Sequence, residues 1–163
     1  MGQKPEADVI TLTLPARVEY VSIARLTVSG IANRMGFAYE DIEDIKLAVA
    51  EACTNAVEHA YDSPQGNDQL RVSCWLLPDR LVVEVQDKGK GLALEKGRET
   101  LAPIRPDVDI DEVKEGGLGL YLIHSVMDEV QVSSYDGVAV TMTKYLRRDE
   151  VSYDDRAISE TEA

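Results

Sequence analysis

The sequence of 163 residues predicts an α+β protein, a two-layer sandwich in which helices cover one face of a mixed, mostly antiparallel sheet. Apolar residues alternate on a two-residue period in several short runs, as in strands, and recur every three or four residues in longer runs, as in helices. The runs follow the order strand, two helices, hairpin, long loop, helix, hairpin. Because most strands come as hairpins and the helices lie between them, this order favours a layer of helices on one face of the sheet.

The N-terminal part is predicted to be a strand followed by two helices. Val9 to Leu14 alternates and stops at Pro15, which cannot donate a hydrogen bond to a neighbouring strand. Apolar residues then recur at helical spacing from Tyr20 to Ile31, and this helix is expected to end towards Gly36. A longer helix is predicted from about Tyr39 to Tyr61.

The remaining strands are predicted as two hairpins with a helix before the second one. The first hairpin joins Leu70–Leu77 to Leu81–Gln86 through Pro78-Asp79, the helix covers Leu118–Met127, and the second hairpin joins Val130–Ser134 to Val138–Tyr145 about Tyr135-Asp136-Gly137. Turn residues at both joints make antiparallel pairing the expected arrangement.

The segment from Leu94 to Glu115 is charged, contains Pro103 and Pro106, and shows no sustained period. Loops of this length inside compact domains are uncommon and are often functional lids. We therefore expect one domain at 9–147 with a lid at about 94–115, an N-terminal tail at 1–8, and an acidic, disordered tail at 148–163.

Composition restricts the partners and the location. The chain has 30 acidic and 17 basic residues, a formal charge of −13, so we expect no direct binding to nucleic acid or to anionic membranes. The acidity favours solubility or a basic partner.

No apolar run approaches the roughly 20 residues of a membrane span and the start lacks a signal region, so we expect a cytoplasmic protein. Cys53 and Cys74 lack metal-ligand spacing and are expected to be reduced, packed thiols.

One flank of the second helix carries Glu51, Asn55 and His59 at intervals of four residues. At about 100° per residue, this row lies roughly a quarter-turn from the apolar stripe that must face the sheet, which contains Ile42, Ile45, Val49, Ala52 and Ala56. Such a row is ordinarily a solvated flank. A carboxylate and a carboxamide one turn apart can also serve phosphoryl transfer, because ionised Glu accepts a hydroxyl proton and an amide oxygen binds Mg²⁺. His59 is expected to pack rather than to act in catalysis.

A turn follows the strand that ends in Asp87, and it contains Gly89 and Gly91. These glycines allow backbone angles and close approaches that a side chain would forbid. A carboxylate held at the strand end can accept a hydrogen bond from an exocyclic amine such as N6 of adenine. Because Asp and Gly are common in turns, a plain surface turn is the alternative.

A glycine loop with Gly116, Gly117 and Gly119 opens the predicted helix at Leu118. Free amides at a helix N-terminus favour a bound phosphate. No Gly-Lys-Ser/Thr follows, so it is not a Walker loop, and no strand precedes it as a dinucleotide fingerprint requires. Each motif is weak alone, and their order and spacing indicate a nucleotide site.

This set resembles the ATP-binding fold of the GHKL (Bergerat) type, which DNA gyrase, sensor histidine kinases and the mismatch-repair ATPase MutL share. The N-box corresponds to residues 51–59, the first glycine box to 87–91 and the second to 116–119. Within this superfamily the chain resembles the anti-sigma-B factors, serine-protein kinases of Gram-positive bacteria, in the runs 51–59, 115–121, 127–130 and 142–146. The resemblance extends from about Val9 to Arg147.

The resemblance implies a homodimeric protein serine kinase that uses ATP and Mg²⁺. Such a kinase holds the general stress sigma factor, sigma-B, inactive and phosphorylates a serine of its anti-anti-sigma antagonist. By this resemblance Glu51 is the general base on that serine, Asn55 the Mg²⁺ ligand and Asp87 the adenine reader, while the glycines of both boxes shape the nucleotide pocket. Arg25 matches a family arginine that contacts both partners, although a solvated helix residue is its alternative reading.

Two positions depart from the family pattern. Glu115, with Lys114 beside it, occupies the place where the sporulation relative carries an arginine, so no lid residue is identified for the phosphates. The last strand is expected to offer a hydroxyl near the adenine. Its register leaves Ala139, Thr141 and Thr143 as candidates, and we favour Thr141.

Two other functions remain open. The chain can be a nucleotide-gated module that binds a partner without transferring phosphate, or the ATP-binding fragment of a sensor histidine kinase. The latter enzymes carry a phosphoacceptor histidine on a helix upstream of the ATP domain. The only histidines here are His59 and His124, both inside the predicted domain, so this alternative is disfavoured.

Overall fold

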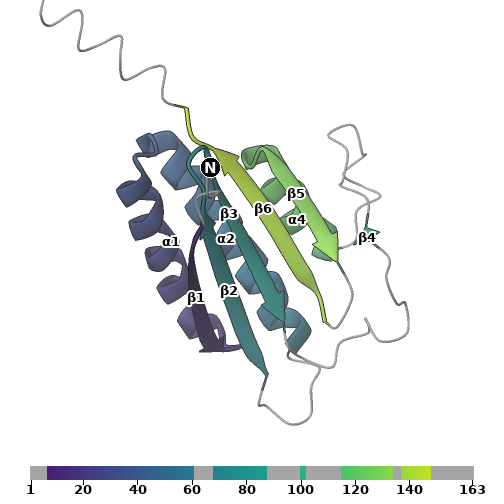
Figure 1. The fold of residues 1–163 in the computed structure, drawn as a ribbon. Helices are drawn as coiled ribbons and strands as arrows, with labels where there is room; N and C mark the ends of the chain where they lie inside the picture. Colours follow the sequence, from purple (N-terminus) through teal and green to yellow (C-terminus); the bar gives the residue numbers. More distant parts are fainter. Residues whose placement is uncertain (1–6, 61–67, 88–99, 102–114, 134–136, 148–163) are drawn as a thin grey trace, which may run out of the picture.

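The computed structural model describes residues 7–60, 68–87, 100–101, 115–133 and 137–147. Figure 1 shows the helices α1, α2 and α4 as one layer behind a single sheet. The elements are β1 (Asp8–Pro15), the 3₁₀ turn η1 (Val18–Tyr20), α1 (Val21–Met35), α2 (Tyr39–Ala60), β2 (Gln69–Leu76), β3 (Arg80–Asp87), β4 (Thr100–Leu101), α4 (Glu115–Val126), β5 (Glu129–Ser133) and β6 (Ala139–Tyr145). The predicted two-layer α+β sandwich is confirmed.

The six strands lie in the order β1-β2-β3-β6-β5-β4 (Figure 1). Every pairing among the described strands is antiparallel, so the parallel component that a mixed sheet would contain is not seen in this part of the chain. The two predicted hairpins place β3 beside β2 and β6 beside β5. The pairing of β3 with β6 joins the two hairpins and brings the end of β3 next to the start of β6.

The ends of the first helix and the first hairpin follow local chemistry. Gly36 has φ of 92°, the left-handed conformation that ends a helix with little strain in glycine, and its amide donates to the carbonyl of Asn33. The turn between β2 and β3 is closed by the amide of Leu77, which donates to the carbonyl of Arg80 at 3.0 Å. Both boundaries agree with the predicted ones.

The core lies between the helices and one face of the sheet. Alternate residues Leu81, Val83 and Val85 of β3 are buried, as the two-residue period requires. The predicted apolar stripe of α2 is also confirmed, because Ile45, Val49 and Ala52 are buried and Ile42 and Ala56 pack at its margins.

Both cysteines are free thiols in this core, as predicted. Burial raises the pKa of Cys53 to about 12 and that of Cys74 to about 11, because a low-dielectric surrounding disfavours the thiolate. Since the thiolate is the reactive form, both side chains act as small apolar groups at neutral pH.

The short strand β4 was not predicted, and it lies inside the segment expected to form the lid. Its residues Thr100 and Leu101 pair with Ser133 and Val132 of β5. The rest of the predicted lid up to residue 114, and the tails at residues 1–6 and 148–163, lie outside the described residues. Within the described parts, no helix combines the length and the apolar character that crossing a membrane requires.

Candidate functional site

The site is built on the second half of α2, where a polar flank borders the core. Glu51 and Asn55 are both half-buried, while Ala52 and Cys53 between them are buried against the sheet. Four residues make about one helical turn, so Glu51 and Asn55 lie one above the other on the same flank. The predicted row is therefore present at Glu51 and Asn55. His59 lies in the last turn of α2.

Asn55 lies directly against α4. A methyl group added at Gly119 would stand 2.7 Å from Nδ2 and 3.1 Å from Oδ1 of Asn55, which is closer than real contacts allow. Only a residue without a side chain leaves this space for the carboxamide. The contact joins two of the three predicted motifs, which are far apart in the sequence.

The glycines of the second motif lie inside the first turns of α4 rather than in a loop before it. The helix begins at Glu115, three residues before the predicted start at Leu118, so Gly116, Gly117 and Gly119 have helical backbone. The first amides of a helix have no acceptor within the helix, and the helix dipole makes that end positive. The start of α4 is therefore suited to an anionic group such as a phosphate.

Asp87 ends β3 on the side of the sheet that the helices cover. It is 3% exposed, and it follows the buried residues Leu81, Val83 and Val85 at the same two-residue interval. Its amide donates to the carbonyl of Val138 at 3.0 Å, which fixes the strand end beside β6. Among the described residues Asp87 is the one buried carboxylate, and a buried carboxylate needs hydrogen-bond donors or a positive charge around it.

Thr141 does not share a face with Asp87. It pairs with Glu84 in the register of β3 and β6, and its Oγ1 lies 3.4 Å from Oε2 of Glu84. Because Val140 and Met142 are buried against the helices, Thr141 must point to the opposite face of the sheet. The structure therefore does not bring Thr141 to Asp87, and the same alternation places Ala139 and Thr143 on the outer face.

Arg25 lies on a different surface. It is an exposed residue of α1, whose buried side consists of Ala24, Val28, Ile31 and Ala32. Ile23 and Leu26 of α1 are also exposed, at 41% and 67%, and three residues apart they share one flank of the helix, whereas Arg25 lies on another flank. Arginine is enriched in protein interfaces, and Arg25 is not part of the α2–α4 site.

Some predicted site residues are not described. Gly89 and Gly91 of the first glycine box lie outside the described residues. Glu115 and Gly116 to Leu118 are described as helical backbone only. The structure thus brings Asn55 against Gly119 near the start of α4, with Glu51 one turn away from Asn55 on α2, and the position of Asp87 is given by β3.

Residues 14–144 match the family described as the histidine kinase-like ATPase domain. The chain is 48% identical to the serine-protein kinase RsbW of Halalkalibacterium halodurans over 157 residues, which cover 96% of this chain and 95% of that protein. It is 47% identical to the serine-protein kinase RsbW of Bacillus subtilis, with 93% and 94% covered. The RsbW protein of Bacillus pumilus is 49% identical, with 90% and 91% covered.

A solved structure supports the fold. The crystal structure of the RsbU and RsbW domains of Rv1364c from Mycobacterium tuberculosis matches with a TM-score of 0.61 at 21% identity. The match covers 86% of this chain and 33% of that one, so the chain corresponds to about a third of the larger protein.

Proposed function

The chain belongs to the histidine kinase-like ATPase domain family and, within it, to the family of the serine-protein kinases RsbW, and from this membership we propose what its site does. The protein is an ATP-dependent protein serine kinase and an anti-sigma factor. It sequesters a sigma factor of the sigma-B type and phosphorylates a serine of the anti-anti-sigma antagonist. The observation that carries this proposal is the contact of Asn55 with Gly119, because it joins the helix that carries the carboxylate and the carboxamide to the N-terminal part of α4.

The residues of α2 supply the chemistry of the transfer. The carboxylate of Glu51 accepts the proton of the substrate serine hydroxyl, whose oxygen then bonds to the terminal phosphorus of ATP as ADP leaves. Half-burial of Glu51 suits this role, because the carboxylate is reachable from outside yet sits beside the core.

Asn55 and the first turn of α4 hold the phosphate end of the nucleotide. The amide oxygen of Asn55 is a hard ligand, and Mg²⁺ bound with a nucleotide needs few protein ligands because the phosphates and water supply the others. The missing side chain at Gly119 provides the space in which this carboxamide lies, so the residues present fit an ATP–Mg²⁺ site. When bound, Mg²⁺ neutralises phosphate charge and orients the transferred group.

Asp87, Gly89 and Gly91 form the base end of the site. The buried carboxylate of Asp87 accepts a hydrogen bond from the exocyclic amine of adenine, and the two glycines let the backbone approach the nucleotide. A carboxylate acceptor favours adenine over guanine, which presents a carbonyl at that position.

The partners bind elsewhere on the chain. Arg25 on the exposed surface of α1 contacts the sigma factor and the antagonist. The protein acts as a homodimer in the cytoplasm. The net charge of −13 favours basic surfaces on these partners and disfavours direct contact with DNA.

Transfer of labelled phosphate tests this function. Incubation with ATP labelled on the terminal phosphate, Mg²⁺ and the antagonist is expected to leave acid-stable label on a serine of the antagonist. Binding of ATP without any transfer indicates the nucleotide-gated binding module instead. Acid-labile label on the chain itself indicates histidine kinase chemistry.

Replacing Gly119 by Ala is expected to weaken ATP binding about 10- to 150-fold, because the displaced carboxamide loses its bond to the charged phosphate–Mg²⁺ group and a bond to a charged group contributes about 1.5–3 kcal/mol. The added methyl group would stand 2.7 Å from Nδ2 of Asn55 and push the carboxamide away. Isothermal titration calorimetry with ATP and Mg²⁺ measures the loss. The matched control is Gly30→Ala in α1, where no atom lies within 4 Å and ATP affinity should not change. Wild-type affinity in Gly119→Ala would contradict the role given to this contact.

Replacing Arg25 by Ala is expected to weaken binding of both protein partners about 30-fold or more, as interface arginines often contribute 2 kcal/mol or more. ATP affinity should be unchanged, because Arg25 is exposed on α1 and lies outside the α2–α4 site. Surface plasmon resonance with each partner gives the two affinities. Arg34→Ala, an exposed arginine on the same helix, is the control. Equal losses in both variants would show a general charge effect rather than a contact of Arg25.

A further inference from the structure

A buried lysine lies at the end of the molecule away from Asp87. Lys144 is 6% exposed and stands on β6 in the same alternating phase as the buried Val140 and Met142. It pairs with Leu81 at the start of β3, whereas Asp87 ends that strand. Lysine is almost never fully buried unless it is paired, so its partners must compensate the charge.

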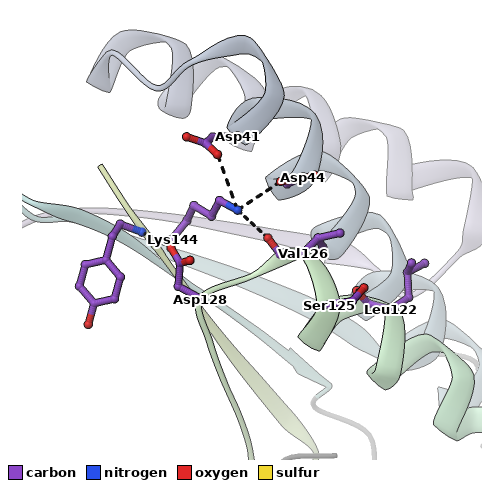
Figure 2. A network of polar contacts seen from close by, with 8 residues as sticks. Asp41, Asp44, Leu122, Ser125, Val126, Asp128 and Lys144 are labelled. Carbon is purple, nitrogen blue, oxygen red and sulfur yellow. Dashed lines mark hydrogen bonds and ion pairs between the residues drawn. The ribbon is translucent and has the colours of Figure 1, made fainter. Parts of the chain in front are cut away.

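The ammonium group of Lys144 joins three elements, as Figure 2 shows. Its Nζ donates to the carbonyl of Val126 at 2.6 Å and to Oδ2 of Asp44 at 3.2 Å, and it lies 3.7 Å from Oδ1 of Asp41. Val126 is the last residue of α4, where the helix dipole is negative and the final carbonyls lack partners. Asp41 and Asp44 lie in the first two turns of α2, so Lys144 ties the start of α2 to the end of α4.

The same two helices meet again at the nucleotide site. Near Lys144 the start of α2 meets the end of α4, whereas at the site Asn55 of α2 meets Gly119 near the start of α4. The helices therefore run antiparallel; they meet directly at Asn55 and Gly119 and are linked through Lys144 at the other end. About three helical turns, roughly 16 Å, separate Asp44 from Asn55.

The core between these helices is apolar and does not by itself fix their relative position. Ile45, Val49 and Ile123 are buried there, and apolar burial is non-directional. Buried hydrogen-bonded charges are directional, and fixing the register of packed elements is their best-attested use. Lys144 has three donor protons, and its carbonyl and carboxylate partners hold α2 and α4 at one position.

We propose that Lys144 is a positioning residue for the nucleotide site: it sets the spacing of α2 and α4 at which Asn55 lies against Gly119. This inference rests on the proposed ATP-binding function. Without the ammonium group, the carboxylates of Asp41 and Asp44 lose this positive partner and the last carbonyl of α4 loses its donor. The two helices can then shift, and the carboxamide of Asn55 moves with α2.

The test compares Lys144→Met with the double variant Asp44→Asn/Lys144→Met. The double variant leaves one unpaired carboxylate fewer than the single variant, so it is used if the single variant does not fold. We expect both to raise the Kd for ATP with Mg²⁺ about tenfold or more, since a lost bond between a polar side chain and a charged ligand group lowers affinity by about that factor. The side-chain amide resonances of Asn55 should also shift in the nucleotide-free protein. The matched control is Lys46→Met, which breaks only the exposed pair with Glu43 on α2, and its Kd should stay within about twofold.

A merely structural role predicts a different result. In that case the double variant, once folded, binds ATP like the wild type and shows unshifted Asn55 resonances, and this outcome overturns the inference. If the wild type itself does not bind ATP, the proposed function fails. The Asn55 resonances of the nucleotide-free protein still test the role of Lys144 in that case, because they shift in the Lys144 variants only if Lys144 positions Asn55.

Discussion

Replacing Glu51 by Gln is expected to slow phosphate transfer to the substrate serine about 10²- to 10⁴-fold, the usual contribution of a general base. Glutamine keeps the size and the hydrogen-bonding reach of the side chain but cannot accept the hydroxyl proton. Because Asn55 and the start of α4 are untouched, the Kd for ATP should stay within about twofold, as for a group that acts in the transition state.

Single-turnover transfer from labelled ATP to the antagonist measures this rate, and calorimetry measures the affinity. Glu58→Gln is the matched control, because it makes the same change on an exposed position of α2. If Glu51→Gln transferred phosphate at the wild-type rate, another residue would be the base. If it instead lost ATP binding, Glu51 would belong to the nucleotide pocket and not to the transfer step.

Replacing Asp87 by Asn is expected to weaken ATP binding roughly 10- to 150-fold, since a hydrogen bond to a charged group contributes about 1.5–3 kcal/mol. Asparagine keeps one acceptor oxygen but replaces the other by an NH₂ donor and removes the charge, so the charge-assisted bond is lost at a site that is 3% exposed. Asparagine has nearly the same volume, which limits the effect on packing. The Kd of each protein for ATP, from calorimetry, gives the loss.

A nucleotide analogue isolates the contact. A purine triphosphate without the exocyclic amine should bind the wild type weakly and should bind Asp87→Asn about as well as ATP does, because the two changes remove the same hydrogen bond. Asp79→Asn, an exposed turn residue at the other end of β3, is the control. Additive losses from the analogue and from Asp87→Asn would exclude a direct contact between Asp87 and the amine.

Most of the fold could be predicted because it follows from local periodicity. The alternation in β1, the strand-like run of β3 and the helical spacing in α2 each predicted an element whose bounds agree with the structure within one or two residues. The start of α4 was predicted three residues late, since glycine is a poor helix former and its packing on α2 outweighs that propensity. The strand β4 was missed because two residues are too short to show any period.

The sequence predicted which residues belong to the candidate site better than it predicted how they are arranged. Glu51 and Asn55 follow from their spacing on one helix flank. Thr141 stays a prediction as the hydroxyl near the adenine, and the structure places it on the face of the sheet opposite to Asp87, because Val140 and Met142 form the buried phase of that strand. Lys144 follows Val140 and Met142 at the same two-residue interval. A lysine in a series of otherwise apolar positions indicates a buried charge.

Local patterns in the sequence were enough to predict the elements, their order, the flank of α2 that carries Glu51 and Asn55, and the family. Three features required the folded chain: the space that Gly119 leaves for Asn55, the direction of Thr141 away from the helices, and the bond of Lys144 to Asp44, 100 positions away. Periodicity reports which side of its own element a residue occupies, whereas contacts between elements depend on strand register and helix packing, which no local pattern contains.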